Sequence, residues 1–109
     1  SRKQMIKLTF MFNREIMHFS ILNKEIYYQD RIWKDSIRCI PKDEKFIEKI
    51  RNSRNKYSPK LIQMFTLSKV QQEEYVNAKD NEELANVIIN DCHKKGIKLI
   101  NREDCNGNL

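Results

Sequence analysis

The spacing of the apolar residues changes once along this chain, near Pro41, and that change most restricts the folds open to it. Before Pro41, apolar and polar side chains alternate, as in MIKLTFMF at residues 5–12, where every second residue is Ile, Leu or Phe. Alternation with period two predicts a strand with one buried face. After Pro41 the apolar residues recur at helical spacing, so the sequence predicts strands first and helices afterwards.

The first 40 residues predict an antiparallel meander. The polar pair Asn13-Arg14 predicts a two-residue hairpin turn, although it lacks the glycine typical of such turns. A second polar pair, Asn23-Lys24, separates the next two strands, and Pro41 ends the last one. The predicted strands cover residues 5–12, 15–22, 25–33 and 36–40.

Helix signals follow Pro41. Residues 41–54 place apolar side chains at helical spacing, with acidic residues in the first turn and basic residues near the end. Three further starts are predicted at Ser58 before Pro59, at Ser68 with Gln71, and at Asp80 with Glu83. Gly96 is expected to terminate the last helix, and IKLI at residues 97–100 predicts a returning strand.

These elements predict the α+β class: a small antiparallel N-terminal β-meander followed by three to four helices and a short closing strand. A length of 109 residues fits one domain, which we expect to span residues 1–100. Residues 101–109 show no apolar pattern and are expected to form a flexible C-terminal tail.

The composition bears on the cellular location of the protein, the redox state of its cysteines and its source. No apolar run approaches the roughly 18 residues of a membrane span, and no secretory signal pattern is present, so we expect no membrane and a cytoplasmic location. The odd number and wide spacing of Cys39, Cys92 and Cys105 predict reduced thiols. Abundant Ile, Lys and Asn suggest an A+T-rich source such as a low-G+C bacterium, its phages or its plasmids.

No catalytic signature is present in the sequence. With only Gly96 and Gly107, the chain has no dinucleotide fingerprint, P-loop or hydrolase elbow. Cys92 and His93 are adjacent on a predicted helix, so their side chains diverge by about 100° and do not suit one metal ion. We therefore expect no metal, no cofactor and no enzymatic activity.

The charge is unevenly distributed. The formal net charge is +6, and residues 1–67 hold 15 Lys and Arg against seven Asp and Glu. Residues 68–91 hold two basic residues against six acidic ones. The molecule is therefore predicted to have a basic part and an acidic part.

The segment RNSRNKYSPK, residues 51–60, has four basic residues and no acid. Arg and Lys bind phosphate, Asn can contact a base edge and Tyr can stack on a base. Basic residues at a helix end also complement the helix dipole, which explains the same charges without a ligand. The predicted nucleic-acid contacts are Arg51, Arg54, Asn55, Lys56, Tyr57 and Lys60.

We therefore expect a small basic non-enzymatic domain that binds DNA or RNA. The alternative is a protein-interaction module, such as a phage-type inhibitor that docks on a host protein through Tyr27, Tyr28 and Trp33. The third predicted strand lacks clean alternation, which leaves edge pairing and a homodimer open.

Overall fold

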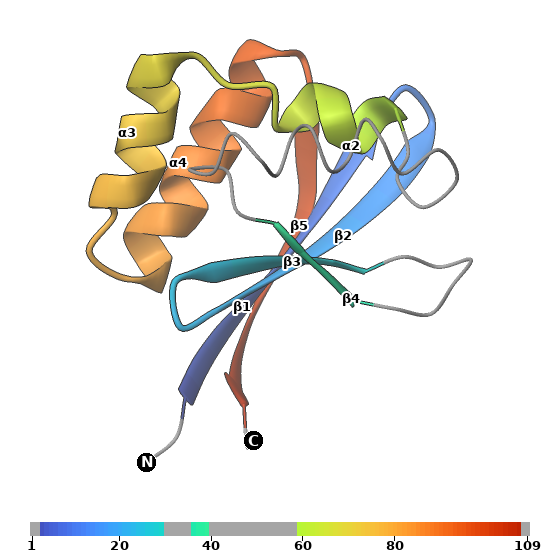
Figure 1. Cartoon of the computed structure of the whole chain (residues 1–109). Coiled ribbons are helices and arrows are strands. Elements are labelled where there is room, and N and C mark those ends of the chain that lie inside the picture. Colours follow the sequence, from blue (N-terminus) through green and yellow to red (C-terminus); the bar gives the residue numbers. More distant parts are fainter. Residues whose placement is uncertain (1–2, 30–35, 40–58, 108–109) are drawn as a thin grey trace.

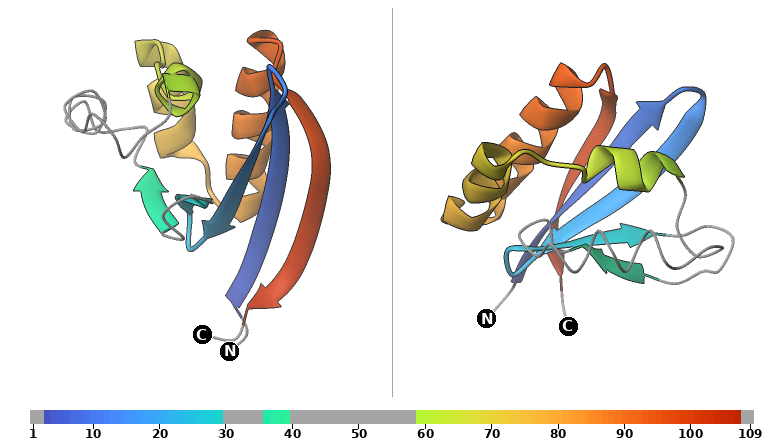
Figure 2. Two further views of the ribbon diagram at one scale, coloured as in Figure 1. Left: turned by 90° about the vertical axis from the view of Figure 1, so that its right-hand side faces the viewer. Right: turned by 45° about the horizontal axis from the view of Figure 1, so that its top comes forward.

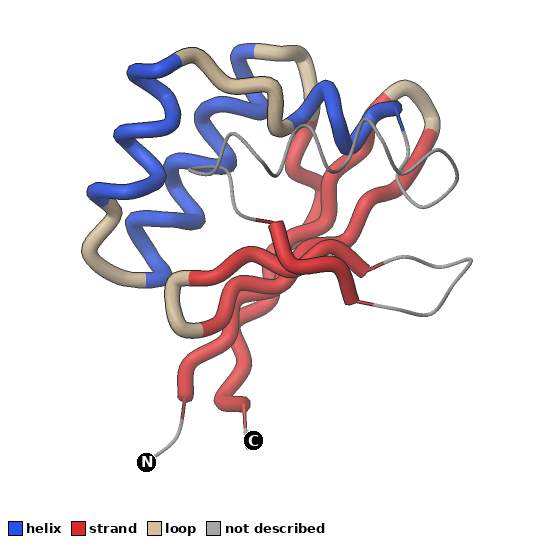
Figure 3. The backbone as a smooth tube through the Cα atoms, viewed as in Figure 1, coloured by secondary structure: helices blue, strands red, loops and turns tan. Residues whose placement is uncertain are grey.

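The computed structural model describes residues 3–29, 36–39 and 59–107, and these form an antiparallel sheet with helices packed on one face (Figure 1). The described helices are α2 (Pro59–Met64), α3 (Lys69–Asn77) and α4 (Asn81–Lys94), joined by the short loops drawn in tan in Figure 3. The predicted α+β class is confirmed. The helix predicted over residues 41–54 lies outside the described residues.

The sheet has five strands in the order β4-β3-β2-β1-β5, and every neighbouring pair is antiparallel. Consecutive strands pair from β1 to β4, while β5 pairs with β1, so Lys3 lies opposite Gly107. The last strand of the chain therefore lies beside the first (Figure 1). The strands are β1 (Lys3–Phe12), β2 (Glu15–Leu22), β3 (Glu25–Gln29), β4 (Ser36–Cys39) and β5 (Lys98–Gly107).

Strand β5 corrects two expectations. It is ten residues long rather than short, and it includes residues 101–107, so the prediction of a flexible tail from residue 101 was wrong there. The register shifts between Thr9 and Phe10, which leaves Ile100 as an extra residue in a β-bulge. The bulge interrupts the period-two pattern of apolar residues, so the pattern does not reveal the rest of the strand. Residues 101–107 are mostly polar and are held in the sheet by their pairing with β1.

Both hairpin turns adopt the left-handed backbone conformation without glycine. Asn13 and Arg14 have φ of 44° and 68°, and Asn23 and Lys24 have φ of 53° and 59°. Positive φ at both central residues is the signature of a type I′ turn, whose twist matches that of the flanking strands. The predicted hairpin turn at Asn13-Arg14 is confirmed, and it is strained relative to one containing glycine.

The hydrophobic core lies between the sheet and the helices (Figure 2). Phe19 on β2 is central, because its ring contacts Phe10 on β1 and Phe65 after α2 edge-on, at centroid distances of 5.9 and 5.8 Å. Such aromatic pairs add about 0.5–1.5 kcal/mol beyond their buried area. The other large side chains that are fully buried in the core are Ile6, Leu8, Met17, Ile21, Ile26, Leu61, Ile88 and Ile97.

The predicted helix signals are confirmed at both starts that follow α2. Ser68 and Gln71 form a reciprocal capping box at the start of α3. The side chain of Asp80 accepts a hydrogen bond of 2.8 Å from the Glu83 backbone N–H at the start of α4. Gly96 follows the end of that helix with φ of 76°, a conformation that favours glycine.

Two side chains tie the helices to other elements. The Lys95 ammonium group donates to the carbonyl oxygens of Gln63 and Met64, at 3.2 and 2.8 Å, and so neutralises the negative end of α2. Asn81, the first residue of α4, accepts from the Lys24 backbone N–H at 2.8 Å and donates to the Gln4 carbonyl oxygen at 2.9 Å. Single side chains thus join both ends of α4 to the rest of the fold.

Asp91 on α4 is the one buried charged residue among the described part of the chain, with 1% of its surface exposed. Neither carboxylate oxygen has a hydrogen-bond partner. Burial raises the pKa of Asp91, and the nearby Glu74 raises it further, while Lys94, Lys95 and the Tyr75 hydroxyl group lower it. Compared with the unfolded chain, the folded state therefore binds the Asp91 proton more tightly.

We predict that this carboxyl group makes the fold less stable as the pH rises. Above about pH 4 the unfolded chain releases the Asp91 proton that the folded chain retains, so the free energy of unfolding should fall. Asp91→Asn should remove this fall, as measured by urea denaturation at a series of pH values. Asp104→Asn is the control, because hydrogen bonding to Arg102 lowers the pKa of Asp104 and gives the opposite dependence. Equal pH profiles for Asp91→Asn and wild type would contradict the prediction.

Glycine at Lys24 should stabilise the protein. The substitution Lys24→Gly relieves the strain of the left-handed conformation, φ of 59°, and keeps the backbone N–H that donates to Asn81. We expect the free energy of unfolding to rise by about 0.5–1 kcal/mol, which already allows for the greater entropy that glycine gives the unfolded chain. Lys79→Gly is the matched control, because Lys79 is an exposed loop residue with negative φ and should lose stability. Thermal unfolding of both variants measures the difference, and destabilisation by Lys24→Gly would refute this account.

Candidate functional site

One face of the sheet lies opposite the described helices (Figure 2) and is here called the open face. It displays polar side chains that the register aligns in two rows. Residues paired across antiparallel strands point to the same side, so each row crosses the sheet. One row consists of Gln29, His18, Thr9 and Asn101, and the next consists of Tyr27, Ser20, Lys7 and Glu103. No described helix lies over this face.

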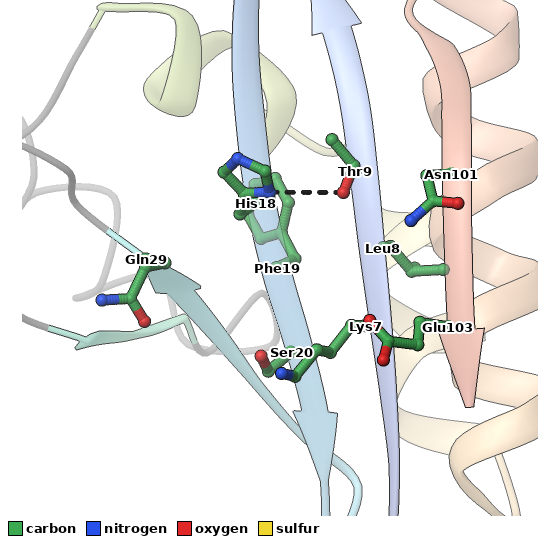
Figure 4. Close-up of a pocket in the computed structure, with 9 residues that line it drawn as sticks. All are labelled: Lys7, Leu8, Thr9, His18, Phe19, Ser20, Gln29, Asn101 and Glu103. Carbon is green, nitrogen blue, oxygen red and sulfur yellow. Dashed lines mark hydrogen bonds between the residues drawn. The ribbon is translucent and has the colours of Figure 1, made fainter. Parts of the chain in front are cut away.

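A hollow of about 350 Å³ lies on the open face (Figure 4). Leu8 and Phe19 belong to its lining although their side chains are buried on the helix side, so β1 and β2 contribute backbone atoms to its floor. Gln29 on β3 and Asn101 on β5 stand at opposite sides. The lining residues are Lys7, Leu8, Thr9, His18, Phe19, Ser20, Gln29, Asn101 and Glu103.

A hydrogen bond orients the imidazole ring in the hollow. Thr9 Oγ1 lies 3.2 Å from His18 Nδ1, across the β1–β2 pair, and both residues are half-buried. The bond occupies one ring nitrogen and restricts rotation of the ring. The hollow therefore contains an aromatic ring held at a defined angle.

The charges in the hollow offset each other. Lys7 and Glu103 are directly opposite in the β1–β5 register, and the other polar lining residues are an imidazole, two hydroxyls and two carboxamides. An anion placed here would meet the Glu103 carboxylate as well as the Lys7 ammonium group. The hollow therefore suits a neutral ligand group with hydrogen-bond donors and acceptors.

The thiols of Cys92 and Cys105 are unsuited to nucleophilic chemistry. Burial raises the pKa of Cys92 to about 12, and burial together with Glu103 raises the pKa of Cys105. A thiol with a raised pKa is uncharged and unreactive at neutral pH. Within the described ranges there is also no group of three His, Cys, Asp or Glu side chains that would hold a metal ion.

Lys60, a predicted nucleic-acid contact, is engaged in holding the fold together. Its ammonium group donates to the carbonyl oxygens of Phe12 and Asn13, each at 3.1 Å, and pairs with the Glu15 carboxylate at 3.0 Å. It thereby fastens α2 to the β1–β2 turn. The other predicted contacts, Arg51, Arg54, Asn55, Lys56 and Tyr57, lie outside the described residues.

The neighbouring tyrosines of β3 point in opposite directions. Tyr28 is 8% exposed and its ring lies 5.3 Å from that of Phe19, so it is a core residue and does not suit the surface contact considered for it. Tyr27 lies on the open face and donates a hydrogen bond of 2.6 Å to the Glu25 carboxylate. Trp33 lies outside the described residues.

Basic and acidic residues balance over most of the described chain. Residues 4–29 and 60–105 hold ten Lys and Arg and ten Asp and Glu. The net charge of +6 therefore comes from the remaining residues, which include Arg51 and Arg54. No described helix is long and apolar enough to cross a membrane.

Comparison with known proteins gives no relative: no family model, curated protein or solved structure matches this chain. The case for a function therefore rests on the chemistry of the open face and on the distribution of charge.

Replacement of Lys60 should cost stability irrespective of any ligand. Lys60→Ala leaves two carbonyl oxygens of the β1–β2 turn without their donor, and we expect a loss of about 1 kcal/mol in the free energy of unfolding. Lys69→Ala, at an exposed position in α3, is the control and should change stability by only a few tenths of a kcal/mol. An unchanged urea midpoint for Lys60→Ala would show that these contacts contribute nothing in solution.

Proposed function

We propose that this protein is a small non-enzymatic domain that binds nucleic acid, either DNA or RNA. The observation that carries the proposal is the separation of two features. The open face supplies neutral hydrogen-bonding groups around a hollow, while residues 51–60 carry four basic residues and no acid. Nucleic acid has matching parts, since its bases are neutral and its backbone is anionic.

Basic residues of the segment 51–60 are proposed to bind phosphate. Arg51, Arg54 and Lys56 provide the positive charge, with Asn55 and Tyr57 adding polar and stacking contacts. Lys60 is expected to contribute less, because its ammonium group already has two carbonyl oxygens and a carboxylate as partners. Contacts of this kind give binding that depends on salt and only weakly on sequence.

The placement of the acidic residues favours the open face over the helices. The net-negative stretch 68–91 forms α3 and most of α4, which pack on the other face of the sheet (Figure 2). Exposed carboxylates of these helices, such as Glu73, Glu74 and Glu82, would repel phosphate. The nucleic acid is therefore proposed to lie across the sheet.

A protein-interaction module is the second candidate, and one observation favours it. Within the described part of the chain β5 is an edge strand of ten residues, and Ile100 at its bulge is 48% exposed. An edge strand can accept an added strand from a partner protein, or from a second copy in a homodimer. Tyr27 and Trp33 remain the aromatic contacts proposed for this alternative, in which the protein docks on a host protein.

Fluorescence-anisotropy titration of single-stranded oligonucleotides at two salt concentrations tests the proposal. We expect the affinity to fall steeply with salt, and the double variant Arg51→Glu, Arg54→Glu to bind at least about tenfold more weakly with a shallower salt dependence. The double variant Lys69→Glu, Lys79→Glu is the matched control, because it changes the net charge equally on and beside α3.

The outcomes separate the two candidates. Equal losses in both double variants would show a general charge effect and remove the assignment to residues 51–60. No binding by the wild type at low salt would reject nucleic acid as the partner and leave the protein-interaction module.

A further inference from the structure

We infer that the hollow on the open face is a subsite for a single nucleobase, which stacks on His18 and is hydrogen-bonded at its edge by Asn101. This inference rests on the proposed function and deepens it, because it names the part of the nucleic acid that the sheet recognises. It is independent of the residues proposed to bind phosphate.

The charge balance of the hollow selects a neutral group. Lys7 and Glu103 lie opposite each other, so a phosphate would gain one attraction and suffer one repulsion. The chain as a whole is nevertheless basic and attracts polyanions. A ligand that is anionic overall and presents a neutral planar group satisfies both conditions, and a single-stranded nucleic acid is such a ligand.

The groups in the hollow match the two ways in which proteins hold an unpaired base. The base face stacks on an aromatic ring, and the base edge forms hydrogen bonds. His18 supplies the ring, and its hydrogen bond to Thr9 holds that ring in place. Asn101 supplies an exposed carboxamide, which offers a donor and an acceptor together.

The volume of the hollow limits its occupant to a small group. About 350 Å³ lies at the lower end of the roughly 300–1,000 Å³ typical of ligand pockets. One base fits this size, while the rest of an oligonucleotide would extend over the neighbouring surface. The remaining side chains of the open face, including Tyr27, are then adjacent to the next nucleotide.

The fold holds this subsite rigidly. His18 and Thr9 project from β2 and β1, the central strands, and Phe19 between His18 and Ser20 is anchored in the aromatic core. Asn101 follows the bulge in β5, which sets its register against Thr9. A site built on strands whose other face is packed keeps its geometry without a ligand.

The test compares a short single-stranded DNA oligonucleotide with the same oligonucleotide carrying stable tetrahydrofuran abasic sites. The wild type should bind the intact oligonucleotide about tenfold more tightly than the abasic one, because the abasic form has no base to stack and form hydrogen bonds in the hollow. Asn101→Ala and His18→Ala should each weaken binding of the intact form and leave binding of the abasic form unchanged. Neither variant should alter the salt dependence, since the phosphate contacts remain.

Asn86→Ala is the matched control, because Asn86 is an exposed asparagine on α4, away from the sheet face. Urea denaturation of every variant identifies any loss caused by unfolding; Asn101 is exposed, so its variant keeps the test valid even if His18→Ala destabilises the fold.

Three results would overturn the inference, and they are distinguishable. Equal binding of intact and abasic oligonucleotides by the wild type would remove the base subsite but leave the proposed function. An equal loss in Asn86→Ala and Asn101→Ala would show that the hollow is not the site. Absence of binding to either oligonucleotide at low salt would remove the proposed function, and the subsite with it.

Discussion

Burial of Phe19 determines the orientation of the residues around it. Its ring packs against Phe10, Tyr28 and Phe65, so β2 has only one side that can face the helices. Because successive side chains of a strand point to opposite faces, His18 and Ser20 must then lie on the other side. A slip of one residue in register would exchange the apolar and polar faces, which is why the core and the open face depend on the same contact.

Polar side chains fasten the helical layer to this sheet at its ends. Lys60 joins α2 to the β1–β2 turn, Lys95 joins α4 to the last carbonyl groups of α2, and Asn81 joins α4 to β1. Each forms hydrogen bonds to backbone groups of another element. Asp91 is the contrasting case, since its buried carboxylate oxygens have no such partner and its pKa is raised.

The sequence predicted those elements whose formation depends on residues close together in the chain. Alternation identified β1 because Ile6, Leu8 and Phe10 all face one core, and side-chain caps identified α3 and α4 because Ser68 and Asp80 act on their own backbone. The pairing of β5 was not predictable in this way, because Ile100 interrupts its period and its partner lies about 90 residues away in the sequence. Asn101 was not predicted as a site residue for that reason. Thr9 and His18 could have been predicted to lie on the face opposite the core, because the alternation in β1 and β2 shows which residues share a face. The irregular pattern of the third strand left the face of Tyr28 undetermined, and the structure places its side chain in the core.

The pairing of β5 with β1 has a consequence for the order of events during biosynthesis. Strand β1 is made first, but the edge that β5 covers stays open until residues 98–107 have left the ribosome. Pairing between the two ends of a chain carries a large loop-closure cost and is slow compared with the formation of a hairpin. The β1–β2 hairpin can therefore form before residues 98–107 are synthesised, whereas the complete sheet cannot, and until then the nascent chain exposes a strand edge that chaperones or neighbouring chains can meet.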